Sequence, residues 1–126
     1  MTSMKLLWLL ILPVLSSAVC AENFDARILF AEAAMQSDEG KTYEKLVRES
    51  TWDADSECFE ASTKIRAASG HYQLVATIDL DGKAKMVEVR PINHYSSCVA
   101  IWFANNRFPK PPRNGWPVRL EVNIQP

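Results

Sequence analysis

Residues 71–90 have the pattern of two strands joined by a tight turn, and they read HYQLVATIDLDGKAKMVEVR. In the first ten of these residues apolar side chains alternate with mostly polar ones, which is the period of a strand with one buried face. Asp81-Gly82 follows and is a strong signal for a hairpin turn. The remaining residues supply a returning strand, which Pro91 ends. We therefore predict an antiparallel β-hairpin.

A helix, a loop and a third strand are predicted after the hairpin. The helix runs to about Asn106, with Ser96 or Ser97 as its cap. Its expected apolar face consists of Cys98, Ile101 and Trp102. Residues 109–115 contain three prolines and are predicted to form a loop. In the last strand apolar side chains alternate with polar ones: Val118, Leu120, Val122 and Ile124 with Arg119, Glu121, Asn123 and Gln125.

Helical segments are predicted before the hairpin. The first spans residues 23–36 with Asn23 as its N-cap, the second spans 42–49, and the third spans 56–68 after a connector at 52–55. We expect one α+β domain at residues 53–126, with a three-stranded antiparallel sheet and helices on one face. A helical arm at residues 22–52 precedes it.

The N-terminus has the pattern of a secretory signal peptide, which we place at residues 1–21. Lys5 gives a positive start, residues 6–15 are almost entirely apolar, and small residues follow. About ten apolar residues are too few for a bilayer, which needs about twenty, so we expect no permanent membrane span after cleavage. The alternative of a lipid anchor on Cys20 fits poorly, because Ser17 and Val19 occupy the places where a lipobox has a branched and a small residue.

The composition argues against several classes of function. With a formal net charge of −1 and only Lys110 and Arg113 as a local basic cluster, the chain has no footprint for nucleic acid. Asp79-Leu80-Asp81-Gly82 resembles a calcium loop, but its twelfth position would be Arg90 instead of an acid. No catalytic or phosphate-binding motif occurs, so we expect no cofactor and no enzyme.

The C-terminal half resembles the C-terminal domain of TonB-type energy transducers. The matching pieces are Asp81-Gly82, Arg107-Phe108, Gly115-Trp116-Pro117-Val118 and the strand to Ile124. The chain is most similar to the AgmX/PglI-type branch, in which each of the two helices has a cysteine. The corresponding residues are Cys58-Phe59 and Cys98-Val99, with Phe108-Pro109-Lys110-Pro111 as the proline motif. The resemblance covers residues 56–125.

This resemblance implies a structure, a location and a role. The helices that hold Cys58 and Cys98 would lie side by side, so a disulfide would join them. The protein would lie in the periplasm and bind another envelope protein, as an accessory to transport. It would do so by adding a partner strand to the edge of its last strand. Flanking that site would be Trp116, Arg119, Glu121, Asn123 and Gln125.

Three alternatives stay open at this point. His94 precedes Cys98 by four residues, so the pair could activate a thiol in a small envelope enzyme or redox protein. Zinc bound by Cys58, Cys98 and His94 would lack an evident fourth ligand. Finally, the segment 23–49 could cover the sheet edge of its own chain or of a neighbour, which would make a self-associating module.

Overall fold

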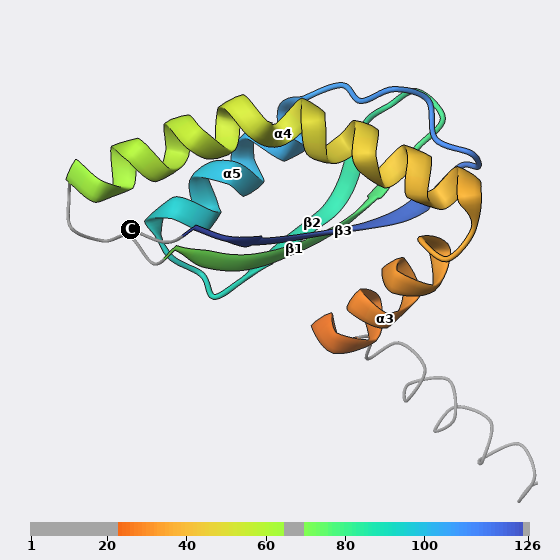
Figure 1. Ribbon diagram of the computed structural model, residues 1–126, viewed down its shortest axis with the longest axis horizontal. Coiled ribbons are helices and arrows are strands. Elements are labelled where there is room, and N and C mark those ends of the chain that lie inside the picture. Colours follow the sequence, from red (N-terminus) through yellow and green to blue (C-terminus); the bar gives the residue numbers. More distant parts are fainter. Residues whose placement is uncertain (1–22, 65–69, 125–126) are drawn as a thin grey trace, which may run out of the picture.

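The structure, a computed structural model, describes residues 23–64 and 70–124 (Figure 1). The predicted signal peptide and Gln125 lie outside the described residues. The elements follow in the predicted order of helix, strand, strand, helix and strand after an N-terminal arm. They are α3 (Phe24–Ala34), α4 (Asp38–Lys64), β1 (His71–Ile78), β2 (Ala84–Arg90), α5 (His94–Asn105) and β3 (Trp116–Asn123). None of the described helices combines the length and the apolar character that crossing a membrane requires.

The three strands form one antiparallel sheet in the order β2-β1-β3, so the predicted fold class is confirmed. The hairpin between β1 and β2 turns at Gly82, which has a φ of 85° and donates its N–H to Asp79 O at 2.8 Å. A Cβ atom at Gly82 would lie 2.2 Å from the carbonyl oxygen of Phe108. The turn therefore needs glycine both for its backbone conformation and for the close approach of the proline loop.

Helices α4 and α5 cover one face of the sheet, and the core lies between these two layers (Figure 1). Tyr72, Leu74 and Ile78 of β1 are fully buried there, against Val99 and Phe103 of α5 among others. The predicted disulfide between Cys58 and Cys98 is present, with 5.7 Å between the two Cα atoms. It joins α4 to α5 above the sheet.

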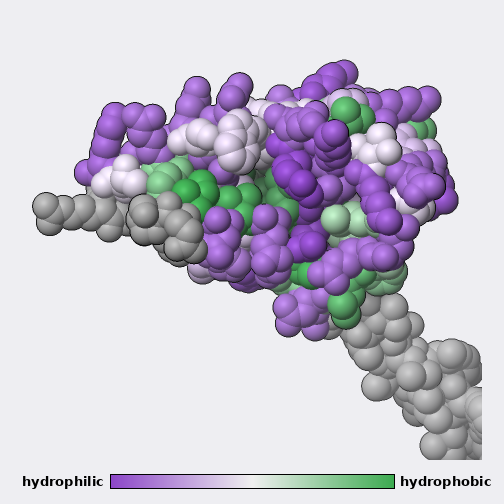
Figure 2. All heavy atoms as spheres, viewed as in Figure 1, coloured by the Kyte–Doolittle hydropathy of each residue, from purple (hydrophilic) through white to green (hydrophobic). Residues whose placement is uncertain are grey.

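One long helix replaces two predicted ones, because α4 continues through residues 52–55, where we expected a connector. It therefore also crosses the predicted boundary between arm and domain. Nothing interrupts it, since residues 41–64 contain neither glycine nor proline. Its buried residues form one stripe at helical spacing, and the opposite side is largely hydrophilic (Figure 2). The stripe consists of Gly40, Tyr43, Val47, Thr51, Ala54, Asp55, Cys58 and Ser62.

Helix α5 begins earlier than predicted, and its apolar face differs from the predicted one in part. Asn93, not Ser96 or Ser97, is its N-cap: the Asn93 side chain accepts the N–H of Ser96 at 2.9 Å, and the Ser96 hydroxyl accepts the N–H of Asn93 at 3.0 Å. Its buried apolar residues are Tyr95, Val99 and Phe103, whereas Ile101 is 66% exposed. Cys98 and Trp102 of the predicted face are partly buried against the core, so the prediction is wrong only at Ile101. Tyr95, Val99 and Phe103 lie at i, i+4 and i+8, which places them together on the core side of the helix.

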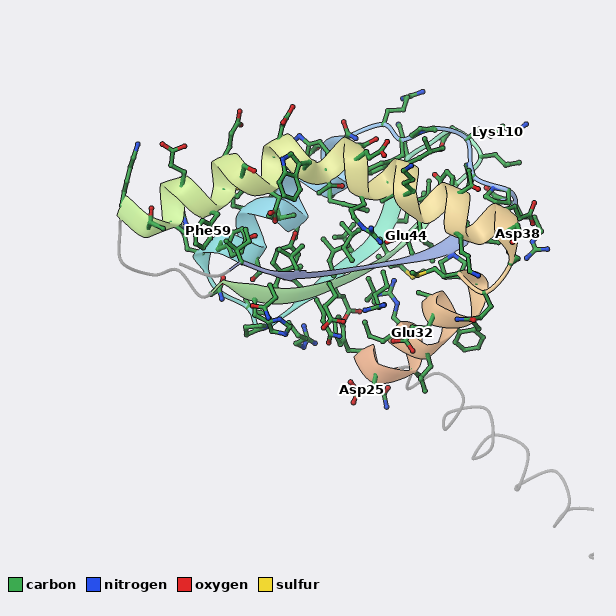
Figure 3. The ribbon with its side chains drawn as sticks, viewed as in Figure 1. Asp25, Glu32, Asp38, Glu44, Phe59 and Lys110 are labelled. Atoms are coloured by element: carbon green, nitrogen blue, oxygen red, sulfur yellow. A yellow bond between two sulfur atoms is a disulfide. The ribbon has the colours of Figure 1, made fainter. Side chains whose placement is uncertain are left out.

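Helix α3 packs on the opposite face of the sheet, against β3 and β1 (Figure 1). Asn23 is its N-cap as predicted, and accepts the N–H of Ala26 at 2.8 Å. Arg27 pairs with Glu88 of β2 at 3.0 Å, and Glu32 lies between α3 and the sheet (Figure 3), 3.7 Å from Arg119 of β3. Part of the β3 face that we predicted to meet water is thus covered by the arm of the same chain.

Candidate binding site at the outer edge of β3

The outermost strands of the sheet are β2 and β3, and they differ in regularity. All eight residues of β3 pair with β1 without a shift in register. The pairing of β2 with β1 contains a bulge, and Met86 has a φ of 53°. Bulges distort a sheet edge and hinder further pairing. The regular edge is therefore that of β3, the strand that we predicted to lie at the edge.

Backbone groups of β3 point alternately toward β1 and away from it. Ile124 donates its N–H to Gly70 O, so Ile124 and every second residue before it hydrogen-bond to β1. The intervening residues Arg119, Glu121 and Asn123 direct their N–H and C=O groups outward. Within residues 23–64 and 70–124, no group hydrogen-bonds to these outward backbone atoms. We call this row the outer edge of β3.

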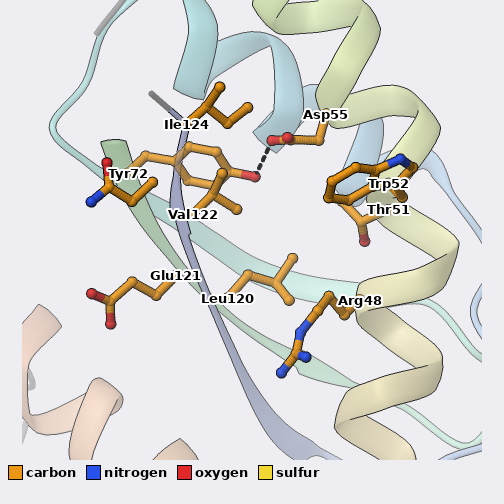
Figure 4. Close-up of a pocket in the computed structure, with 10 residues that line it drawn as sticks. Arg48, Thr51, Trp52, Asp55, Tyr72, Leu120, Glu121, Val122 and Ile124 are labelled. Atoms are coloured by element: carbon orange, nitrogen blue, oxygen red, sulfur yellow. Dashed lines mark hydrogen bonds between the residues drawn. The ribbon is translucent and has the colours of Figure 1, made fainter. Parts of the chain in front are cut away.

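A pocket of about 220 Å³ lies beside this edge, between β3 and α4 (Figure 4). Figure 2 shows an apolar strip below α4. Trp52 of α4, at the side of the pocket, is 65% exposed. The lining residues are Arg48, Thr51, Trp52, Asp55, Tyr72, Leu120, Glu121, Val122, Asn123 and Ile124. An extended chain paired with β3 would therefore place every second side chain at the mouth of this pocket.

On the other face of β3, the charged side chains of the predicted site form a network. Arg119 Nη1 lies 2.6 Å from Glu121 Oε2 within the strand, and Arg119 Nε lies 3.7 Å from Glu32 of α3. Gln73 of β1 also reaches Glu121, at 3.5 Å. The structure thus brings Arg119 and Glu121 together, with Asn123 on the same face of the strand.

Trp116 is not the surface anchor that we predicted. Its side chain is 4% exposed and belongs to the core, at the start of β3. The guanidinium carbon of Arg113 lies 5.0 Å from the centre of its ring. The alternation of β3 places Trp116 on the same side as Val118 and Leu120, which face α4 and α5, and this explains its burial. The exposed tryptophan beside the edge is instead Trp52.

Asp55 is a buried residue of this pocket that the sequence analysis missed. It is 3% exposed, and its Oδ1 accepts the hydroxyls of Tyr72 at 2.7 Å and Tyr95 at 2.6 Å. Burial first, and then the bond to the Asp55 carboxylate, raise the pKa of both tyrosines far above the ordinary value. One signal could have identified Asp55: it occupies a buried position in the helical stripe that continues from Val47 to Ser62.

The structure also shows the positions of Cys98 and His94, the two residues of the alternative with an activated thiol. Cys98 is bonded to Cys58, and His94 lies 3.0 Å from the hydroxyl of Ser62. His94, Ser97, Cys98 and Ile101 line a shallow depression together. No group of three His, Cys, Asp or Glu side chains among the described residues could hold a metal ion. Because their sulfurs form a disulfide, neither Cys58 nor Cys98 is a thiolate or a ligand for zinc.

Compared with protein-family models, with curated proteins and with solved structures, the chain has no match. An open strand edge with an apolar pocket beside it suits the binding of an extended peptide segment.

Proposed function

We propose that this protein is an exported protein-binding module of the TonB C-terminal-like type, which recognises a partner in the cell envelope by sheet-edge contact. An extended segment of the partner would form a fourth strand beside β3. The observation that supports this proposal is the regular outer edge of β3, whose outward groups have no hydrogen-bond partner among the described residues. The edge opposite, at β2, is bulged.

The edge and the pocket would contribute differently to binding. Arg119, Glu121 and Asn123 each offer one N–H and one C=O, and each net hydrogen bond contributes about 1 kcal/mol. Backbone hydrogen bonds form with almost any partner sequence, so they contribute affinity but do not distinguish one partner sequence from another. Selection would come from the pocket, where alternate side chains of the partner meet Leu120, Val122 and Trp52.

The proposed location is the periplasm, and two observations support it. Residues 1–21 have the pattern of a leader, and the Cys58–Cys98 disulfide suits an oxidising compartment. An accessory role in envelope transport rests on the resemblance alone. The disulfide disfavours the thiol-enzyme alternative, because Cys98 has no free thiol while it is bonded to Cys58.

Removal of one outward N–H tests the proposal. Glu121→Pro removes the backbone N–H of residue 121, which points outward and does not hydrogen-bond to β1, so the sheet should persist. The added strand of the partner would lose its hydrogen bond to this N–H, and the proline ring would hinder its approach. The matched control is Glu121→Ala, which loses the same side chain but keeps the N–H. Each variant would serve as bait for affinity capture from a periplasmic extract, and circular dichroism would check the fold.

We expect a partner band with wild type and with Glu121→Ala, and its loss with Glu121→Pro. Equal capture by folded Glu121→Pro would contradict strand addition at this edge. Equal loss in both variants would show that the Glu121 side chain is the determinant, and would also contradict a backbone mechanism.

A further inference from the structure

The pocket beside β3 contains a negative charge that lacks a cationic partner among the described residues. Asp55 is 3% exposed, and no described lysine, arginine or histidine lies within ion-pairing distance of its carboxylate. Arg48, which also lines the pocket, is already paired with Glu44. Glu121 also borders the pocket, but its carboxylate is paired with Arg119 on the other face of β3. Buried carboxylates are costly unless they are paired, so that of Asp55 is available to a cation.

One oxygen of Asp55 is free to make that contact. Both tyrosine hydroxyls bond to Oδ1, and no described donor reaches Oδ2. Asp55 is one of the residues that line the pocket, so a cation bound there would approach this carboxylate (Figure 4).

The rest of the pocket suits an amphipathic side chain with a charged end. Leu120, Val122 and Ile124 supply apolar surface for a methylene stem, as long cationic side chains prefer. Trp52, 65% exposed, offers an aromatic face to a cation. An acidic group would instead be repelled by Asp55.

We propose that this pocket binds the cationic end of a lysine or arginine side chain, with its charge at Asp55 and its stem along β3. This inference rests on the proposed function, because the side chain would belong to the partner segment that pairs with β3. It adds a requirement to that segment: a lysine or arginine on the face that meets α4.

The probe for a test is N-acetyl-lysine methylamide, compared with N-acetyl-norleucine methylamide, which has a similar length and no charge. Each would be titrated into the ¹⁵N-labelled protein, and shifts of the Trp52 indole N–H and the β3 amides would be followed. The variant is Asp55→Asn, which removes the charge and keeps an oxygen for the two hydroxyls. Its matched control is Asp53→Asn, an exposed position on the same helix.

We expect a saturable shift with the lysine probe, and binding weaker by roughly tenfold or more with norleucine and in Asp55→Asn, as for the loss of a charge-assisted contact. Asp53→Asn should bind like wild type. Equal binding of both probes, an unaffected Asp55→Asn, or no saturable shift would overturn the inference.

A second variant covers the case in which Asp55→Asn does not fold. Trp52→Ala leaves the hydrogen bonds of Asp55 in place and should weaken binding of the lysine probe, whereas unchanged binding would contradict the proposed pocket. Failure here is distinguishable from failure of strand addition. The probes form no strand, and the comparison of Glu121→Pro with Glu121→Ala requires no cation.

Discussion

Asp55 of α4 accepts the hydroxyl of Tyr72 of β1 at 2.7 Å, which ties the middle of the long helix to the central strand. The same oxygen accepts the hydroxyl of Tyr95, so one carboxylate connects α4, β1 and α5. The rings of Tyr72 and Tyr95 meet edge to face, with their centres 5.1 Å apart. This connection positions α4 beside β3, and with it the pocket at the outer edge.

Replacement of Asp55 by alanine should lower the free energy of unfolding by about 3 kcal/mol. Two buried hydroxyls would each lose their acceptor, and an unpaired buried polar group costs about 1–3 kcal/mol. Urea unfolding followed by circular dichroism measures the effect. Asp53→Ala, on the exposed side of α4, is the control and should change stability by less than about 0.5 kcal/mol. Equal effects in the two variants would contradict the bridging role of Asp55.

All three tyrosines of the chain should resist ionisation in the folded state. Burial raises the pKa of Tyr43 to about 12, and raises the pKa values of Tyr72 and Tyr95 still further. Absorbance at 295 nm during an alkaline titration should therefore show no tyrosinate near pH 10 while the protein is folded. In urea all three should titrate near the ordinary value of about 10.

The raised pKa values also fix how stability depends on pH. Above pH 10 the unfolded chain releases tyrosine protons that the folded chain keeps, so the free energy of unfolding falls as pH rises. The free energy of unfolding should fall by about 1.4 kcal/mol per pH unit for each tyrosine that is still protonated in the folded protein. For Tyr43 this contribution ends near pH 12, where its hydroxyl ionises in the folded protein as well. A tyrosine that titrates reversibly at about pH 10 with a native circular dichroism spectrum would contradict its burial.

Loss of the Cys58–Cys98 disulfide should lower the free energy of unfolding by up to about 4 kcal/mol, because the bond closes a loop with a sequence separation of 40 residues. The measurement is urea unfolding of Cys20→Ser with and without a reductant. The same variant, denatured without reductant, should show no free thiol. Two free thiols in the oxidised sample would contradict the disulfide and would revive the thiol alternative.

The ion pair between Arg27 and Glu88 should respond unequally to removal of either partner. Glu88→Gln leaves a guanidinium that is 9% exposed without its carboxylate, which should cost about 1–3 kcal/mol. Arg27→Met removes the buried charge and keeps an apolar side chain, so stability should change by less than about 1 kcal/mol. Thermal unfolding of both variants gives the comparison, and a larger cost for Arg27→Met would contradict it.

Strands and turns could be predicted from short-range pattern. The hairpin depends on Asp81-Gly82 and on alternation, and β3 has the same alternation, so all three strands were predicted correctly. The position of β3 at an edge was predicted only through the family resemblance. Its regularity was not predicted, and the bulge at Met86 left no signal that the sequence analysis used.

Helix length and facing were harder to predict, because they depend on what packs against a helix. Thr51, Asp55 and Ser62 interrupt the apolar stripe of α4 in the sequence, yet each is buried. Thr51 and Ser62 donate to carbonyls one turn earlier, and Asp55 accepts two hydroxyls from other elements. Residues that satisfy their polar groups in this way look like surface residues in a sequence. The pocket was missed for the same reason.

Amide hydrogen exchange in β3 tests the central claim most directly. In the free protein, the amides of residues 120, 122 and 124 bond to β1 and should exchange slowly, whereas those of Arg119, Glu121 and Asn123 should exchange rapidly. In a complex with the captured partner, these three outward amides should become slow as well. If they stay rapid while the partner is bound, the partner does not add a strand to β3, and the proposed mechanism is wrong.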